Sequence, residues 1–253
     1  MSKLKLLIAT HKVYTFPKAD CYFPIQVGKS NSQEFGIQGD NTGEHISEKN
    51  KTFCELTALY WAWKNLDNYD YIGLVHYRRH FSGVGLFLKG KTIVSQSELL
   101  ADLENYDVIV AKKRKYYIES VYSHYKNAHF IKDLDATKRI IASFFPEYQS
   151  AFDKVMKGYS LHLFNMFVMS KSHFKQYCEW LFSILFELEK QLDMSSYDSY
   201  QRRVFGFIAE RLFNVWLVKN NLKIKERKVI ALEGENRVKK AIDLLKRKFL
   251  HKR

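Results

Sequence analysis

The apolar run Tyr71–Val75 ends abruptly in the polar cluster His76-Tyr77-Arg78-Arg79-His80, and this junction constrains the fold more than any other segment. The run has the length and composition of a buried β-strand. In open α/β sheets, ligands bind beyond the carboxyl ends of such strands. Adjacent guanidinium groups match phosphate oxygens and stay charged at any working pH. We therefore predict an anion site here, although an ordinary solvated basic turn fits the same spacing equally well.

Strand-like apolar runs alternate with amphipathic stretches along the rest of the chain. Further strands are predicted at 4–9, 106–111, 163–169 and 223–229. Helices are predicted at 52–65, 118–132, 134–144, 147–157, 172–192 and 199–219, with a helix start at 95–98. Residues 13–50 and 82–90, punctuated by glycines, are expected to form loops. This alternation is typical of an α/β domain with a mainly parallel central sheet flanked by helices.

Polar residues follow three of the predicted strands. These groups are Thr10-His11-Lys12, His76–Arg79 and Lys112-Lys113-Arg114. If the strands are parallel neighbours, their carboxyl ends meet at one edge of the sheet, which is a second reason to expect an anion site there. The glycine motifs of P-loop, dinucleotide-binding and α/β-hydrolase proteins do not occur in the sequence.

Composition narrows the class of protein. With 253 residues and 46% hydrophobic content, the chain can bury one large core or two small ones. The longest apolar runs are far shorter than the ~20 residues of a membrane span. The first ten residues lack a full signal-peptide core, so we expect a cytoplasmic protein. The three cysteines are far apart in the sequence, which favours buried free thiols over zinc ligands or disulfides.

The positive charge is concentrated at the C-terminus. The net charge is +14, and residues 236–253 supply eight Lys or Arg and one Asp, a difference of seven charges. Apolar residues recur there at helical spacing, namely Val238, Ile242, Leu245 and Phe249. We interpret 231–253 as a basic amphipathic tail that lies on an anionic membrane surface, or else as a solvated terminal helix. Nucleic-acid binding is a third interpretation, disfavoured because the aromatic residues are not interleaved with the basic ones.

Two carboxylates are candidates for acid–base chemistry. Asp198 stands just before a predicted helix, where it serves either as a cap or as a general base near a ligand cleft. Glu210 and Arg211 lie within an apolar helical stretch, where such a pair is either a structural ion pair or part of a site. Both alternatives remain open for each carboxylate at the level of sequence.

An ordered set of motifs carries a family resemblance. In order these are 39–43 (GDNTG), 46–50 (ISEKN), 54–61 (CELTALYW), 73–79 (GLVHYRR) and 205–212 (FGFIAERL). The chain resembles a bacterial family of unknown-function domains encoded in capsular and exopolysaccharide loci. Members are described as glycosyltransferases, and some look like galactofuranosyltransferases that use UDP-galactofuranose. The resemblance covers roughly residues 4–230 and leaves the tail outside.

The resemblance implies a GT-A-like domain over 1–230 that transfers a hexose, with inversion, from a UDP-sugar to a lipid-linked glycan at the inner face of the cell membrane. The usual GT-A fold binds a divalent metal through Asp-x-Asp after a central strand. Here His76-Tyr77-Arg78 stands in that place. We therefore predict no cofactor and metal-independent catalysis, in which Arg78 and Arg79 neutralise the departing diphosphate.

This hypothesis assigns roles to particular residues. The predicted donor- and nucleotide-binding residues are Thr10, His11, Lys12, Asp40, Asn41, Lys49, Asn50, Glu55, His76, Tyr77, Arg78 and Arg79. Asp198 is the first choice for the catalytic base and Glu210 the second. Two alternatives stay open: a transferase that uses UDP-galactopyranose or UDP-glucose, and a non-enzymatic basic module that binds nucleic acid or polyphosphate.

Overall fold

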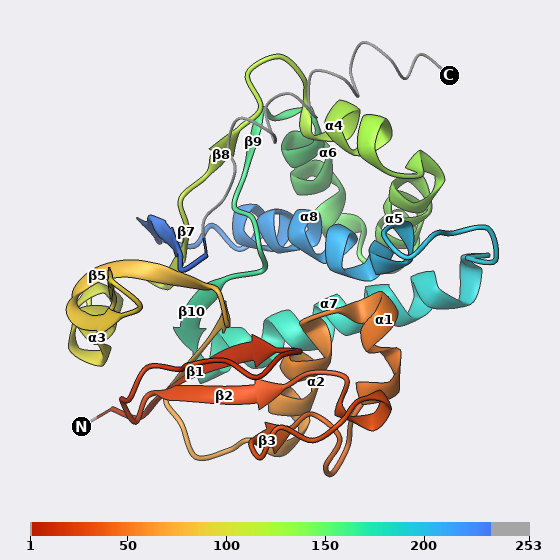
Figure 1. Cartoon of the computed structure of the whole chain (residues 1–253). Helices are drawn as coiled ribbons and strands as arrows, with labels where there is room; N and C mark the ends of the chain where they lie inside the picture. Colours follow the sequence, from red (N-terminus) through yellow and green to blue (C-terminus); the bar gives the residue numbers. More distant parts are fainter. Residues whose placement is uncertain (1, 234–253) are drawn as a thin grey trace.

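The computed structural model describes residues 2–233 (Figure 1). Its strands are β1 (Leu4–Thr10), β2 (Tyr22–Gln26), β3 (Gln38–Gly39), β4 (Tyr71–His76), β5 (Arg79–Leu88), β6 (Lys91–Ile93), β7 (Val108–Ala111), β8 (Arg114–Lys115), β9 (Ser160–Leu161), β10 (Phe167–Ser170), β11 (Ile224–Arg227) and β12 (Val229–Ala231). Its α-helices are α1 (Asn50–Phe53), α2 (Leu56–Asn65), α3 (Gln96–Leu103), α4 (Val121–Ala128), α5 (Ile131–Phe144), α6 (Gln149–Lys157), α7 (Lys171–Gln191) and α8 (Val204–Lys219). Nearly all of the predicted tail 231–253 lies outside the described residues.

The central sheet has the strand order β11-β7-β10-β4-β1-β2-β3. β1 runs parallel to β2 and β4, and β11 runs parallel to β7. β10 is antiparallel to both β4 and β7, so the sheet is mixed but mostly parallel. Because β10 is antiparallel to both of its neighbours, β7 points the same way as β4 and β1. The predicted α/β fold is confirmed, and the carboxyl ends of these three strands meet at one edge.

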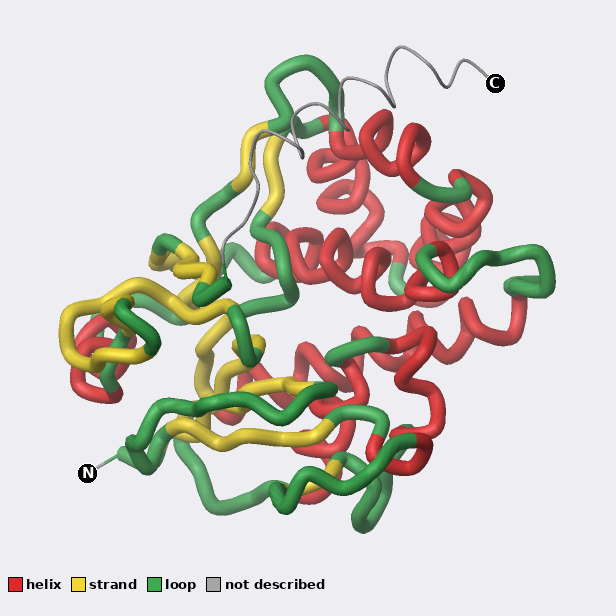
Figure 2. The backbone as a smooth tube through the Cα atoms, viewed as in Figure 1, coloured by secondary structure: helices red, strands yellow, loops and turns green. Residues whose placement is uncertain are grey.

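Both faces of the sheet are buried, which explains why the central strands read as continuous apolar runs. Alternate residues of β1 face opposite sides: Leu7 belongs to a core shared with α2, α7 and α8, whereas Leu6 and Ile8 belong to a second core shared with α3 and β5. In Figures 1 and 2 most helices lie to the right of the strands, with α4, α5 and α6 beyond α8, whereas α3 lies at the left beside β5.

The structure corrects several predictions of local structure. Within 13–50, predicted as a loop, β2 pairs with β1 in register from Leu6 to Thr10. Pro24 interrupts the apolar residues around it, and a proline argues against a strand inside a sheet, so sequence patterns hide this strand. Residues 82–88 belong to the long strand β5, and only 89–90 form a turn, which leads to β6. The strand predicted at 163–169 starts only at Phe167, because the backbone of the residues just before it is left-handed.

Candidate active site

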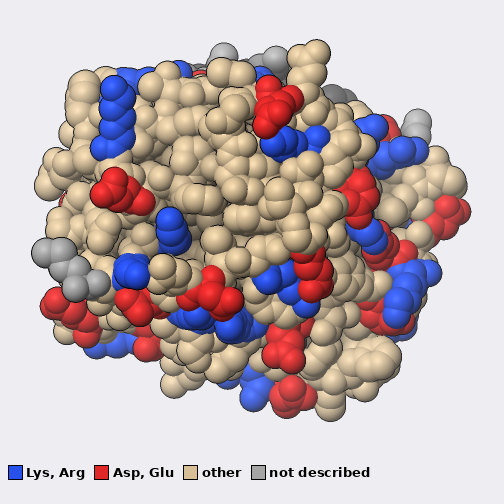
Figure 3. All heavy atoms as spheres, turned by 90° about the horizontal axis from the view of Figure 1, so that it is seen from below, with Lys and Arg blue, Asp and Glu red and all other residues tan. Residues whose placement is uncertain are grey.

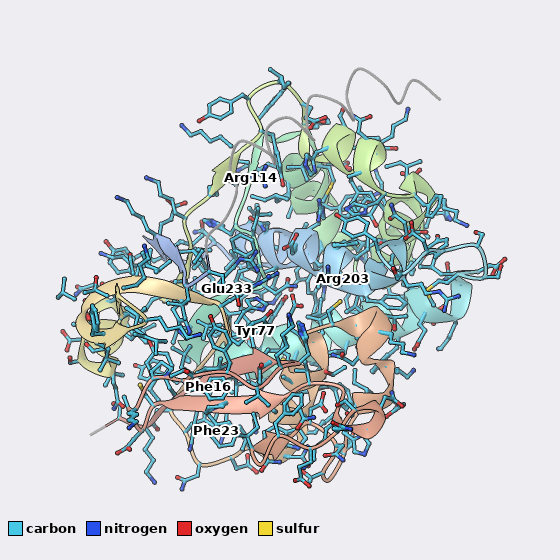
Figure 4. All side chains as sticks on the ribbon, viewed as in Figure 1. Phe16, Phe23, Tyr77, Arg114, Arg203 and Glu233 are labelled. Carbon is cyan, nitrogen blue, oxygen red and sulfur yellow. The ribbon has the colours of Figure 1, made fainter. Side chains whose placement is uncertain are left out.

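A cavity of about 860 Å³ lies at the carboxyl ends of β1 and β4. The sheet supplies one wall, which includes His11 and His76–Arg79. The facing wall comes from α1 and from the segment that leads into α8. Figure 4 shows Tyr77 and Arg203 approaching the same central region from these two sides. This is the place where open α/β sheets bind ligands.

His76 is the last residue of β4, and a contact with the backbone orients its side chain. Its Nε2 lies 2.7 Å from the carbonyl oxygen of Phe164. A carbonyl only accepts hydrogen bonds, so Nε2 carries the proton of the ring. Burial lowers the pKa of His76, chiefly by desolvation, although the carboxylate of Glu55 opposes the shift. His76 therefore presents a neutral imidazole with an Nδ1 lone pair.

A strained turn at Phe164 and Asn165 connects the walls of the cavity. Both residues have positive φ, at 75° and 51°. The amide N–H of Phe164 donates to Glu210 Oε1 at 2.8 Å. Asn165 Nδ2 donates to Glu55 Oε1 at 2.8 Å and contacts the carbonyl of Gly206 at 3.3 Å. Left-handed backbone in residues other than glycine is costly and is often found at functional sites.

Glu210 is a largely buried carboxylate at the cavity. Its side chain is 18% exposed, and Oε2 lies 3.3 Å from Arg211 Nη1. Burial raises the pKa of Glu210, and the positive charge of Arg211 partly offsets this shift. A carboxylate with a raised pKa at the wall of a cleft has the properties of a general base.

Guanidinium groups line both walls. Arg79 packs over the ring of Phe164 at 4.6 Å, and Arg78 lies 3.6 Å from Glu233. On the facing wall, Arg203 Nε donates to the sulfur of Cys54 at 3.4 Å.

The cavity carries a positive field. Burial lowers the pKa of His11, and the charges of Lys12, Arg78 and Arg203 lower it further, so guanidiniums of both walls act on one ring. Five lining residues of the described chain carry a positive charge, namely Lys51, Arg78, Arg79, Arg202 and Arg203, whereas Glu55 and Glu210 carry the carboxylates. This excess favours a multiply charged anion.

The structure brings many of the predicted site residues together. Those that line the cavity are His11, Asn50, Glu55, His76, Tyr77, Arg78, Arg79 and Glu210. The basic cluster 112–114 does not line it, because the chain leaves β7 towards β8 and the helices beyond.

Other predicted residues have structural contacts away from the cavity lining. The hydroxyl of Thr10 bonds to the backbone of Lys12. Asp40 is buried and accepts the amide N–H groups of Gly28 and Lys29. It also accepts the hydroxyl of Ser47. Lys49 pairs with Glu189 at 2.6 Å. Asn41 is half-buried beside Asp40.

Asp198 lies in the exposed loop before α8. Its Oδ1 accepts the amide N–H groups of Tyr200 at 2.9 Å and Gln201 at 2.7 Å. This is the geometry of a capping aspartate, and the side chain does not belong to the cavity lining. Its neighbours Tyr197 and Ser199 do line the cavity.

Sequence reasoning missed Arg202, Arg203, Cys54 and Phe164 as lining residues. The Arg202-Arg203 doublet before an apolar helix was the only visible signal. Its position opposite Arg78 depends on how α8 packs against the sheet. Cys54 is a free thiol, as predicted for all three cysteines, and burial raises its pKa to about 12.

Within residues 2–233, the structure contains no group of three or more His, Cys, Asp or Glu side chains arranged to hold an ion. Glu55 and Glu210 are engaged by Asn165, Phe164 and Arg211. None of the described helices is long and apolar enough to cross a membrane.

Comparison with known proteins places the chain in a family. Residues 5–221 match the profile of a domain of unknown function, DUF4422. The chain belongs to the DUF4422 family. This DUF4422 chain is also similar to a solved structure described as the apo form of the bifunctional glycosyltransferase WbbM, with a TM-score of 0.83 and 35% sequence identity. The alignment covers 92% of this chain and 46% of that chain, so the DUF4422 chain spans about half of the WbbM chain. No curated protein matches significantly.

These findings confirm the predicted resemblance to a family of unknown-function domains related to glycosyltransferases. The α/β architecture of the DUF4422 chain is that of the matching part of WbbM.

Proposed function

We propose that this DUF4422 chain is a glycosyltransferase that moves a hexose from a nucleotide-diphosphate donor to a glycan acceptor. The observation that carries the proposal is the cavity itself, in which guanidinium groups on two walls surround a buried carboxylate. The similarity to WbbM supports the same class of reaction. We assign galactofuranose from UDP-galactofuranose as the donor, with inversion, and a lipid-linked glycan at the inner membrane face as the acceptor.

The arginines supply the charge that the departing diphosphate requires. Arg78 and Arg79 reach it from the turn between β4 and β5, and Arg203 reaches it from the start of α8. Guanidinium groups bind diphosphate oxygens through paired hydrogen bonds and need no proton exchange. His11, Asn50 and Glu55 line the same space and contact the rest of the donor. The reaction is therefore expected to proceed without added metal.

Glu210 is the group that takes the acceptor proton. In the displacement, the acceptor oxygen forms a bond to the anomeric carbon while the bond to the diphosphate oxygen breaks, and the acceptor proton passes to a base on the opposite side. Glu210 lies at the cavity, is largely buried and has a raised pKa. The capping role of Asp198 makes it the weaker choice.

A thermal-shift screen tests the donor assignment. The ligands are UDP, UDP-galactofuranose, UDP-galactose, UDP-glucose and GDP, each with and without EDTA. A ligand at about 100 times its Kd adds roughly 2.7 kcal/mol to the stability of the native state. We expect the uridine ligands to raise the Tm with and without EDTA, and galactofuranose to give the largest shift among the sugars.

Two outcomes contradict this assignment. If EDTA abolishes the Tm shift, the diphosphate is bound through a metal ion and not by the arginines alone. If none of the five nucleotides raises the Tm, the cavity is not a nucleotide-donor site. The Arg78→Ala variant, which lacks one guanidinium group of the diphosphate site, should lose most of the UDP shift and serves as the control for specific binding.

A further inference from the structure

A small two-stranded sheet supports a protruding loop at one end of the molecule. β8 pairs antiparallel with β9, with Arg114 opposite Leu161 and Lys115 opposite Ser160. The loop that follows β8 rises above this pair before the chain enters α4 (Figure 1, Figure 2). We call residues 112–118 and 157–159 the tip.

Large apolar side chains point into solvent at the tip. Tyr117 is 81% exposed, Ile118 is 55% exposed and Tyr159 is 58% exposed. Monomeric proteins seldom expose several such groups together unless they contact something else.

The backbone of the tip holds these groups in place. The amide N–H of buried Tyr116 donates to the carbonyl of Tyr159 at 2.8 Å, and the N–H of Ile118 donates to Tyr116 at 2.7 Å. Tyr117 itself has a φ of 58°, a conformation that costs free energy for a tyrosine. The fold therefore maintains a strained turn that presents an aromatic ring outwards.

Basic residues flank the exposed apolar groups along the chain, and one acidic residue, Glu119, follows Ile118. Lys112, Lys113, Arg114 and Lys115 are consecutive and all exposed, and Lys157 is exposed beside Tyr159. Figure 4 shows Arg114 on β8 below the loop. By contrast, the face seen from below in Figure 3 has acidic and basic side chains interspersed.

We propose that the tip is a membrane-docking surface that inserts Tyr117, Ile118 and Tyr159 into the interface of an anionic lipid bilayer. Tyrosine favours the level of the lipid headgroups, an aliphatic side chain gains from the acyl boundary, and lysines near the surface are attracted to anionic lipids. A nucleic acid would interact with the basic residues but would gain little from an exposed isoleucine. The combination of basic and apolar side chains therefore favours a lipid surface over nucleic acid.

A short segment that includes β9 connects the tip to a wall of the cavity. Tyr159 precedes Phe164 by five residues, and Phe164 lines the cavity. An extended chain of that length spans at most about 18 Å. A docked tip therefore holds the cavity close to the bilayer surface, where a lipid-linked substrate is found. The surface itself does not depend on the proposed transferase activity.

A fluorescence experiment on the full chain tests the proposal locally. Tyr117→Cys is labelled with a polarity-sensitive thiol probe and mixed with vesicles of phosphatidylcholine, with or without phosphatidylglycerol. The matched control is Phe144→Cys, because Phe144 is 62% exposed and is separated from Tyr159 by α6. The unsubstituted chain, in which Cys21 and Cys178 are buried and the pKa of Cys54 is raised to about 12, measures background labelling.

We expect a blue shift of the probe at position 117 with anionic vesicles only, and no shift at position 144. The combined Tyr117→Ser, Ile118→Ser and Tyr159→Ser chain should partition onto these vesicles roughly tenfold less than the wild type, whereas Phe144→Ser should match the wild type. The proposal is overturned if the protein does not bind the vesicles, if it binds while the probe at 117 stays unchanged, or if both probes shift equally. A response at 117 to a homopolymeric RNA, without one to vesicles, assigns the tip to nucleic acid instead.

Discussion

At the scale of single residues, surroundings decide what a carboxylate can do. Glu210 is enclosed by the turn at Phe164 and by Arg211, and burial raises its pKa. Asp198 is exposed and binds two backbone N–H groups of the next turn. Asp198 precedes α8 and Glu210 lies within it. Of the two, only Glu210 lines the cavity and has the chemistry of a base.

The Glu210→Gln variant is expected to lower kcat by about 10² to 10⁴, the usual contribution of general-base catalysis. The amide oxygen of glutamine can still accept the N–H of Phe164, so the fold should remain intact. Asp198→Asn is the matched control, because asparagine caps helices as well as aspartate. Release of UDP gives the rates. A normal rate for Glu210→Gln would exclude it as the base.

The same carboxyl group determines a pH dependence. A base acts when it is deprotonated, so kcat/KM should rise as the pH increases through the pKa of Glu210. Because burial raises this pKa, the rise should be centred above the ordinary value of 4.5 for a glutamate. A pH–rate profile of the wild type measures this rise in kcat/KM, and the profile of the Glu210→Gln variant should lack it.

At the scale of elements, β4 is the strand that fixes the site, and its neighbours leave no room for a side chain at Gly73. A Cβ there would lie 2.8 Å from Val168 Cγ2 and 2.7 Å from Leu6 Cδ1, and even closer to the carbonyl oxygen of Phe167. The glycine lets β1 and β10 close on β4 from both sides, which places His76 against Phe164.

Gly73→Ala is therefore expected to destabilise the protein by about 2–3 kcal/mol, as overpacking of a rigid core does. Gly206→Ala in α8 is the contrasting variant, since its Cβ would meet Cys54 Sγ at an ordinary 3.4 Å. There the gain in helix propensity should leave stability unchanged or raise it by up to about 1 kcal/mol. Urea unfolding measures both. Equal changes in the free energy of unfolding for the two variants would show that the close packing around Gly73 does not determine stability.

At the scale of the whole molecule, the cavity joins two parts of the chain that are distant in sequence. Arg78 follows β4, and Arg203 precedes α8. Both lower the pKa of His11, so their charges reach the same point in the cavity. The proposed diphosphate site therefore exists only when the helices around α8 are packed against the sheet.

A double-mutant cycle tests this arrangement. Arg78→Ala and Arg203→Ala should each weaken UDP binding by about 1.5–3 kcal/mol, the range for hydrogen bonds to charged groups. Together they should depart from additivity, because both guanidiniums hold one ligand. Titration calorimetry gives the affinities, with Arg139→Ala, an exposed residue of α5, as the control. Strict additivity, or no effect of Arg203→Ala, would separate Arg203 from the donor site.

The sequence by itself determined the local features of this protein. The apolar run of β4 and its polar end, the capping box of Ser95 and Glu98, and the amphipathic face of α7 all follow from spacing and side-chain type, and the structure confirms them. Local patterns determine these features because each depends on residues within a few positions of one another.

Only the tertiary structure decided which residues share the cavity. In the folded protein β2 pairs with β1, and the chain turns at Phe164. Arg203 lies on the facing wall of the cavity, and Asp198 lies outside the lining. These contacts join positions that are tens to more than a hundred residues apart, and they form only because the apolar faces of the sheet and of α8 must be buried together. The sequence encodes that burial collectively, so no short motif reveals it.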